Sequence, residues 1–165
     1  EASCTGLAVT RLQGFDIPAV MQFIQIFAEG LESYPFVEYP PVRPMPEALD
    51  VKVVKQPLGV CGLITAWNGP LFLAFLKMLP AIAAGNTVVI KPAEQTPHIA
   101  TRMVRIFHES LKAQMWQGEI DPMHVLQFLP GRGETVGAAL VRDPRTAIIA
   151  FTVSKFSDGG QSIRI

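Results

Sequence analysis

Cysteine is scarce in this chain, which holds only Cys4 and Cys61. The two lie far apart and neither belongs to a CxxC pair, so the sequence indicates neither a disulfide framework nor a zinc site. The three histidines, His98, His108 and His124, also lack the spacing of metal ligands. We therefore expect no bound metal, and a reducing compartment such as the cytoplasm or the mitochondrial matrix.

An excess of charge of either sign is absent as well, because 14 Lys and Arg residues balance 14 Asp and Glu residues. No basic patch stands out that would attract nucleic acid or an anionic membrane. The longest apolar run, residues 71–84, is interrupted by Lys77 and Pro80 and is shorter than the ~20 residues of a membrane-spanning helix. We expect a soluble protein without nucleic-acid or membrane partners.

A leader sequence is not visible, since the chain starts at Glu1 with no initiator Met, basic region or apolar stretch. Any targeting segment is then absent or lies upstream. With 49% hydrophobic and 17% charged residues, the chain has the composition of a packed globular protein. Its 165 residues suit one domain or part of one, and we expect a piece of a longer protein.

The first third of the chain shows two patterns. Residues 16–32 carry apolar side chains at steps of three and four, which predicts an amphipathic helix with Asp16 as its N-cap and Pro18 in its first turn. Five prolines between residues 33 and 50 exclude a helix there and predict an extended connector over the surface. Residues 51–55 then alternate between apolar and charged, as a ribbon or edge strand does. We therefore divide the chain at residue 50, into parts 1–50 and 51–165.

From residue 59 onward, short β-rich runs alternate with helical stretches. Strands are expected at 59–65, 87–90, 125–129 and 148–152, and helices at 71–84, 97–113 and 134–142. The run 87–90 is apolar throughout, which is typical of a parallel sheet covered on both faces. The predicted fold class is α/β, with a doubly wound, mostly parallel, Rossmann-like sheet preceded by the N-terminal helix and the ribbon strand.

A glycine-rich loop follows the expected strand 125–129. Gly131 and Gly133 begin a dinucleotide fingerprint, but the next glycine, Gly137, comes four residues after Gly133 rather than three. A tight turn from strand to helix explains these glycines about as well as a phosphate ligand does.

Several longer motifs are more specific. Residues 57–70 read PLGVCGLITAWNGP, residues 79–97 read LPAIAAGNTVVIKPAEQTP, residues 129–137 read LPGRGETVG, and residues 151–154 read FTVS. In order and spacing these resemble the aldehyde dehydrogenase superfamily, over most of the chain from Val51 to Ser154. The resemblance implies that part 51–165 belongs to an NAD-binding domain whose first strand serves oligomerisation.

The resemblance implies two catalytic positions. Asn68 would donate its amide to the oxygen that becomes negative when a cysteine attacks an aldehyde; without the motif, an Asn before a Gly-Pro turn is more often a helix cap. Lys77 matches a position near the family's active site, but a lone lysine on an apolar helix also snorkels to solvent.

The resemblance also implies NAD as the cofactor. Lys91 and Glu94 would reach the adenosine ribose at the carboxyl end of a strand, and the carboxylate of Glu94 would oppose the 2′-phosphate of NADP. A solvated pair in a loop is the alternative. The cofactor contacts implied are Ile64, Thr65, Trp67, Lys91, Ala93, Glu94, Gly133, Gly137 and Ser154.

The chain departs from the family in two respects. The family's nucleophilic cysteine and glutamate base follow the FTGS region by a long stretch and are not found by residue 165, while Cys61 falls in an expected buried strand. Val153 stands where the family has a glycine, which puts cofactor binding in doubt.

Two hypotheses follow from the sequence. The first is a fragment of an NAD-dependent aldehyde dehydrogenase that oxidises an aldehyde to a carboxylate, is inactive alone and forms a homo-oligomer in the complete protein. Residues 129–137 and 151–155 look most like the branch that oxidises glutamate semialdehyde, formed from pyrroline-5-carboxylate in proline breakdown. The second is a non-catalytic module that keeps the fold for assembly.

Overall fold

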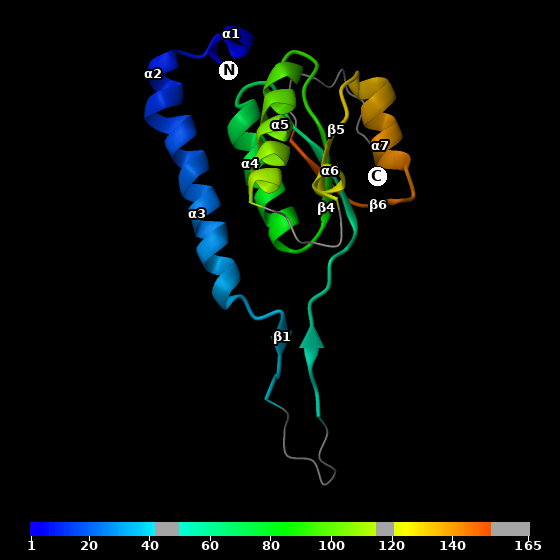
Figure 1. Cartoon of the computed structure of the whole chain (residues 1–165). Helices are drawn as coiled ribbons and strands as arrows, with labels where there is room; N and C mark the ends of the chain where they lie inside the picture. The colour runs from blue at the N-terminus through cyan, green and yellow to red at the C-terminus, as the bar shows by residue number, and fades with distance from the viewer. Residues whose placement is uncertain (42–49, 115–120, 153–165) are drawn as a thin grey trace.

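A computed structural model describes residues 1–41, 50–114 and 121–152. Figure 1 shows a central sheet with helices packed against it, a long helix alongside, and a narrow hairpin that projects away from the body. In the described ranges, no helix is long and apolar enough to cross a membrane.

The sheet contains four parallel strands: β3 (Val60–Ile64), β4 (Thr87–Lys91), β5 (Leu126–Phe128) and β6 (Thr146–Phe151). Their order across the sheet is β5-β4-β3-β6. The chain therefore moves outward from β3 to β5 and then returns to place β6 on the other side of β3. This reversal confirms the predicted doubly wound fold class.

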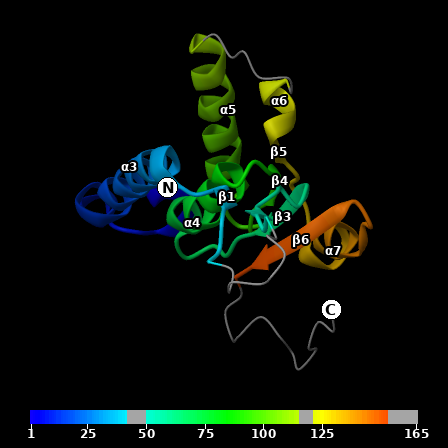
Figure 2. The same cartoon turned by 90° about the horizontal axis from the view of Figure 1, so that it is seen from below.

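The crossover helices lie on opposite faces of the sheet (Figure 2). Helices α4 (Pro70–Ala83) and α5 (Pro97–Ala113) cover one face, and the short α7 (Ala138–Arg142) lies on the other. The predicted helix 134–142 is two elements, because a π-helical turn η2 (Gly133–Gly137) precedes α7. Part of the predicted strand 125–129 is also wrong, since α6 (Pro122–Val125) extends to Val125 and Asp121 caps it by accepting from the Met123 N–H at 2.8 Å.

The core lies between the sheet and helices α4 and α5. Its fully buried side chains include Leu63, Val88, Ile90 and Leu126 from the strands and Met78 from α4. Each such side chain contributes about 1.5–3 kcal/mol of burial free energy. These contacts fix the carboxyl ends of the strands relative to one another.

Strand β6 is less covered than the apolar run 87–90 of β4. Ile148 and Phe151 are exposed, at 44% and 47%. Helix α7 has only five residues, and Leu140 is the one that it buries. The adjoining face of β6 therefore stays open in the described part of the chain.

The N-terminal helix begins earlier than predicted. Helix α1 (Ala2–Thr5) is followed by α2 (Val9–Arg11), the π-helical turn η1 (Leu12–Asp16) and α3 (Ile17–Ser33), which run on without a break from Val9. Asp16 is therefore not an N-cap: its backbone is helical and its buried carboxylate lies 3.4 Å from the Arg11 Nε. The ion pair with Arg11 is the recorded compensation for burying this carboxylate.

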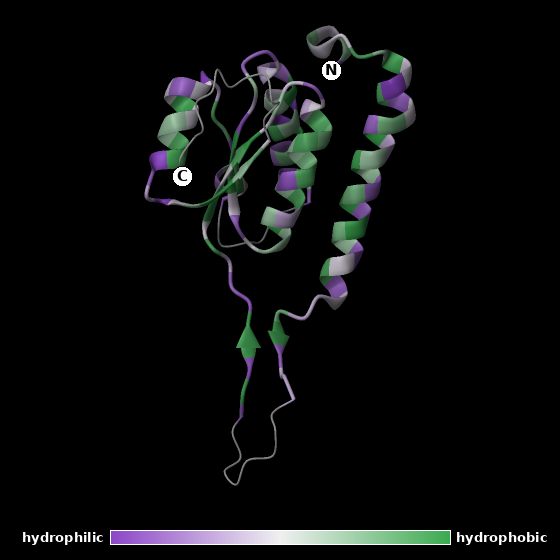
Figure 3. Ribbon diagram, turned by 180° about the vertical axis from the view of Figure 1, so that it is seen from behind, coloured by the Kyte–Doolittle hydropathy of each residue, from purple (hydrophilic) through white to green (hydrophobic). Residues whose placement is uncertain are grey.

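The projecting hairpin pairs β1 (Val37–Glu38) with β2 (Val53–Val54) in antiparallel register. The predicted ribbon strand 51–55 is thus only two residues long, and the proline-rich connector contributes its partner strand. The ammonium of Lys55 donates to the Glu38 carboxylate and lies 4.6 Å from the Tyr34 ring centroid. Figure 3 shows hydrophobic residues on both strands of this hairpin.

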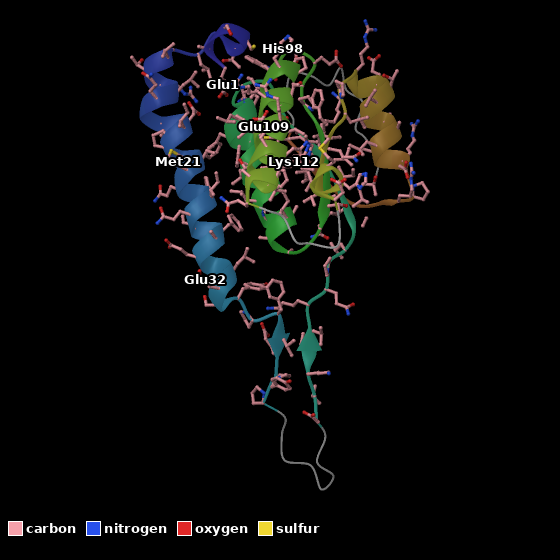
Figure 4. The ribbon with its side chains drawn as sticks, viewed as in Figure 1. Glu1, Met21, Glu32, His98, Glu109 and Lys112 are labelled. Atoms are coloured by element: carbon pink, nitrogen blue, oxygen red, sulfur yellow. The ribbon has the colours of Figure 1, made fainter. Side chains whose placement is uncertain are left out.

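Helix α3 packs along α4 through aromatic contacts, in which Phe23 and Phe72 have ring centroids 5.6 Å apart. Beside this contact, an apolar groove of about 930 Å³ runs between α3, α4 and α5. Glu1 and His98 are among its lining residues and lie near the upper ends of the helices, while Glu32 lies near the lower end of α3 (Figure 4).

Candidate cofactor site at the carboxyl ends of the strands

Four loops meet at one edge of the sheet because all four strands are parallel. They follow β3 at Thr65, β4 at Pro92, β5 at Leu129 and β6 at Thr152. The reversal of strand order between β3 and β6 lies at the same edge, where open α/β sheets bind ligands. We therefore expect the predicted site residues to lie at this edge.

Lys91 ends β4 and is buried, with 3% of its surface exposed. Its Nζ donates to the Pro92 carbonyl at 3.0 Å, and its aliphatic stem lies against Gly137, 3.7 Å from where a Cβ would stand. Burial lowers the pKa of this ammonium, and the nearby negative charge of Glu94 partly opposes that shift. Lys91 thus places a charged donor with spare N–H groups beneath the loops.

Glu94 joins two of these loops. Its Oε1 accepts a hydrogen bond from the Gly133 N–H at 2.7 Å, across 39 positions of sequence. Ala93 lies half-buried beside it. Together with prolines and glycine from the two loops, these residues line a pocket of about 310 Å³: Pro92, Ala93, Glu94, Pro97, Pro130, Gly131 and Arg132.

The first glycine of this loop, Gly131, has a local structural explanation. Its φ is +148°, and a Cβ there would lie 2.3 Å from the Val136 side chain. Only glycine fits this turn without strain. The chain then enters η2 with the Arg132 carbonyl accepting from the Val136 and Gly137 N–H groups at 2.9 and 3.1 Å.

The loop after β3 lies across the centre of the edge. Ile64 is half-buried and its carbonyl accepts from the Thr152 N–H at 3.2 Å, while the N–H of buried Thr65 donates to the Lys91 carbonyl at 3.2 Å. Trp67 is exposed at 48%. These bonds connect the strand ends on both sides of the reversal.

Asn68 is exposed, and it is not the cap of the following helix. Helix α4 begins at Pro70 with Gly69 as its N-cap and without a side-chain cap hydrogen bond. The capping alternative for Asn68 is therefore wrong, and its amide is left at the edge of the site.

Lys77 is half-buried on α4 and its ammonium donates to the Thr152 hydroxyl at the end of β6. Burial lowers the pKa of this ammonium. A snorkelling lysine would extend its charge into solvent, so the structure favours a place at the sheet edge. Sequence analysis did not single out Thr152, because no local pattern links residues 75 positions apart.

Three further predictions have different outcomes. Cys61 is buried in β3 as predicted, and burial raises the pKa of its thiol, which disfavours a nucleophilic role. Ser154 and Val153 lie outside the described residues. The Nε2 of His108 lies 2.8 Å from the Leu126 carbonyl, and the described ranges hold no group of three His, Cys, Asp or Glu residues suited to a metal.

The site residues therefore form two groups. Lys91, Ala93, Glu94, Gly133 and Gly137 gather between the loops after β4 and β5. Ile64 and Lys77 lie toward β6, where Thr152 connects them, and Thr65 bonds to Lys91 between the two groups. Together the fold and the site define a doubly wound, Rossmann-like α/β domain.

The chain belongs to the aldehyde dehydrogenase family, whose model, described as "Aldehyde dehydrogenase family", matches residues 1–159. It is 32% identical over 154 residues, 93% of its length, to an aminoacetaldehyde dehydrogenase of Pseudomonas aeruginosa. Among solved structures it resembles PnpE in complex with nicotinamide adenine dinucleotide, with a TM-score of 0.74 and 31% identity over 90% of this chain.

A second solved structure is that of GapN, a glyceraldehyde-3-phosphate dehydrogenase of Methanocaldococcus jannaschii complexed with NADP. Its TM-score is 0.72 and its identity 26%, over 82% of this chain. The chain spans 28% of the length of each of these three proteins.

Proposed function

We propose that this chain is the cofactor-binding portion of an NAD-dependent aldehyde dehydrogenase. The observation that carries the proposal is the hydrogen bond from the Gly133 N–H to Glu94, directly beside the buried ammonium of Lys91. It sets an acceptor and a donor side by side at the edge where doubly wound sheets bind nucleotides.

The residues present fit an adenosine ribose. One recorded hydrogen bond occupies Lys91, so its ammonium can donate to ribose hydroxyls as well. One oxygen of the Glu94 carboxylate is held by Gly133, which orients the other as an acceptor. Pro92, Pro97 and Pro130 give the adjoining pocket rigid apolar walls.

The remaining site residues would serve the reaction itself. When bound, NAD would supply a hydride acceptor beside the substrate carbon after a nucleophile has added to it. Asn68 would donate to the oxygen that gains negative charge, and the bond between Lys77 and Thr152 would hold the end of β6 in place. Because Cys61 is buried, the nucleophile and the general base would come from other parts of the complete protein.

The hairpin is proposed as the assembly element of a homo-oligomer. Val37, Val53 and Val54 are all exposed on a ribbon that projects from the body (Figure 1). A strand with a free edge and apolar side chains recruits another chain. Lys52 and Lys55 argue against edge pairing, because charged residues block it; Lys52 is exposed, whereas Lys55 is engaged by Glu38 within the hairpin.

The substrate branch remains a prediction from residues 129–137 and 151–155, with glutamate semialdehyde as its aldehyde. A non-catalytic assembly module is the second candidate, favoured by Val153 in place of a glycine. Turnover by the complete protein decides between the two candidates.

Binding is tested by fluorescence titration of the 165-residue chain with NADH. We expect saturable binding that is weakened at least tenfold by Glu94→Ala, while Glu109→Ala, on the exposed surface of α5, leaves it unchanged. No binding, or equal loss in both variants, contradicts the proposal.

Catalysis is tested in the complete protein. Asn68→Ala should lower kcat about 10²–10³-fold, as removal of an oxyanion donor does elsewhere. The 165-residue chain alone should form no NADH from any aldehyde, since donors cannot start the reaction without a nucleophile. A complete protein that binds NADH but oxidises no aldehyde would support the assembly module.

A further inference from the structure

The first turn of α4 has no cap from its own residues. The N-cap residue Gly69 has no side chain, and Pro70 at the first helical position has no N–H group. The N–H of Leu73 donates to the Gly69 carbonyl at 2.9 Å, while the N–H of Leu71 has no acceptor inside the helix. An acceptor for Leu71 therefore has to come from another part of the chain.

That acceptor is the carboxylate of Glu1, 70 positions earlier, whose Oε1 lies 3.4 Å from the Leu71 N–H nitrogen. Glu1 is half-buried and lies near the upper ends of the helices (Figure 4). Burial raises the pKa of its carboxyl, although the hydrogen bond from Leu71 opposes that shift. The helix dipole also favours a negative charge at this end. Glu1 thus serves as the cap of α4.

Two aromatic side chains of the N-terminal segment contact the next residue of the same turn. The ring centroid of Phe72 lies 6.4 Å from that of Phe15 and 5.6 Å from that of Phe23. Aromatic pairs at such distances are favourable beyond the area that they bury. The segment from Glu1 to Phe23 therefore holds the first turn of α4 by a hydrogen bond and by packing.

The loop that carries Asn68 lies between two anchored points. At its start, the N–H of Thr65 donates to the Lys91 carbonyl at 3.2 Å. At its end, three residues after Asn68, Leu71 bonds to Glu1. The sheet thus fixes one end of the loop and the N-terminal segment fixes the other. A shift of the first turn of α4 would move the Asn68 amide relative to the sheet edge.

We propose that Glu1 is a positioning residue for aldehyde oxidation, which holds the loop 66–69 so that the Asn68 amide lies where the oxyanion forms. Oxyanion donors are effective when they are preorganised, because no ordering is then needed during the reaction. A misplacement of about 1 Å can lower a rate about 10²-fold. This inference rests on the proposed role of Asn68 in the complete protein.

The first test measures kcat and the Kd for NADH in the complete protein. Glu1→Ala should lower kcat about tenfold, through partial misplacement of Asn68, and change the Kd less than twofold. Glu1→Gln keeps an acceptor oxygen at the same reach and should recover most of the kcat. Glu1→Asp keeps the charge on a shorter side chain and should behave as Glu1→Ala does. Glu32→Ala, on the exposed surface of α3, is the matched control and should change neither quantity.

A double-mutant cycle shows whether Glu1 acts through Asn68. In the Asn68→Ala background, Glu1→Ala should lower kcat by less than about twofold more, because the donor that it positions is gone. Two independent losses that multiply overturn the inference and leave the role of Asn68 standing, as does an unchanged kcat in Glu1→Ala alone. If Asn68→Ala keeps full kcat, the proposed role of Asn68 and the inference both fail.

Hydrogen exchange tests the contact of Glu1 with α4 without turnover. Peptides that cover residues 70–76 should exchange at least threefold faster in Glu1→Ala than in the parent protein, whereas peptides from α5 should exchange at the same rate. Unchanged exchange at residues 70–76 overturns the inference. Faster exchange throughout the domain overturns it too, because Glu1 would then stabilise the whole fold rather than this turn.

Discussion

The ammonium group of Lys91 is buried at the end of β4. Transferring an ammonium out of water is unfavourable, and the recorded compensation is one carbonyl acceptor and the negative charge of Glu94 nearby. Such a group is destabilising for the fold and useful to a ligand. The same side chain therefore links stability and binding.

Replacing Lys91 by methionine should raise the free energy of unfolding by about 1 kcal/mol at pH 7, because it removes a buried charge at similar volume. NADH binding should fall at least tenfold. Urea unfolding and fluorescence titration measure the two effects. A variant that is less stable than the parent would show that the ammonium stabilises the fold.

The pH dependence of stability follows from the direction of the Lys91 pKa. The folded value lies below the ordinary 10.5, so between the two values the unfolded chain binds more protons. The free energy of unfolding should therefore rise with pH in the window just below 10.5. Lys91→Met should reduce that rise, whereas Lys112→Met, on exposed surface, should not.

Glu94 should set the cofactor preference in the complete protein, because its carboxylate repels a 2′-phosphate. Replacing Glu94 by glutamine removes the charge and keeps an acceptor. The ratio of the NADPH Kd to the NADH Kd should fall, with Glu134→Gln as the exposed control in the same loop region. An unchanged ratio would contradict this role.

Cys61 should be chemically inert in the native chain, since burial raises the pKa of its thiol. Ellman's reagent should modify the half-buried Cys4 rapidly and Cys61 only in denaturant. Formation of NADH from an aldehyde that is abolished by Cys61→Ser would overturn both the burial argument and the proposal that the nucleophile lies elsewhere.

The roles of single residues could be predicted where the residue belongs to a sequence motif. They could not be predicted where the role depends on a contact with a residue far away in the sequence. Lys91, Glu94 and Gly133 stand in long motifs, and the structure brings them together. The bond of Lys77 to Thr152 and the place of Arg132 in the pocket arise only when loops meet. The prediction of Asp16 as a helix N-cap was wrong, because a local capping pattern does not show that the residue is buried.

At the scale of elements, the hairpin offers a direct test of assembly. Val53→Pro removes a backbone N–H from β2 and should dissociate the oligomer of the complete protein while the nucleotide domain stays folded. Light scattering after size exclusion reports the mass, and circular dichroism reports the fold.

Val54→Asp, which keeps the backbone intact, should weaken assembly through the exposed apolar face. An unchanged mass in both variants would remove the hairpin from the interface.

The regular elements were more predictable than the irregular ones. Helix α5 has the bounds expected from its apolar period, α4 is shifted by one residue at both ends, and β4 is one residue longer at its end. The two-residue β1 and the four-residue α6 were missed, because elements this short have no detectable period. Their positions depend on the partners that they contact.

At the scale of the whole molecule, α3 contacts the body along only part of its apolar face. Ile17, Met21, Ile24, Ala28 and Leu31 are spaced four and three residues apart, and all are exposed. Part of this stripe borders the groove between α3, α4 and α5. The described chain therefore keeps a continuous apolar surface in contact with water.

That hydrated surface has a calorimetric consequence. Unfolding raises the heat capacity by about 12–15 cal/mol/K per residue when a domain newly exposes its apolar interior. Here the groove and the exposed apolar residues of α3 are already hydrated in the folded chain. The heat-capacity increment of unfolding per residue should therefore fall below that range, and scanning calorimetry measures it. A smaller heat-capacity increment flattens the stability curve, so the chain should lose little stability on cooling.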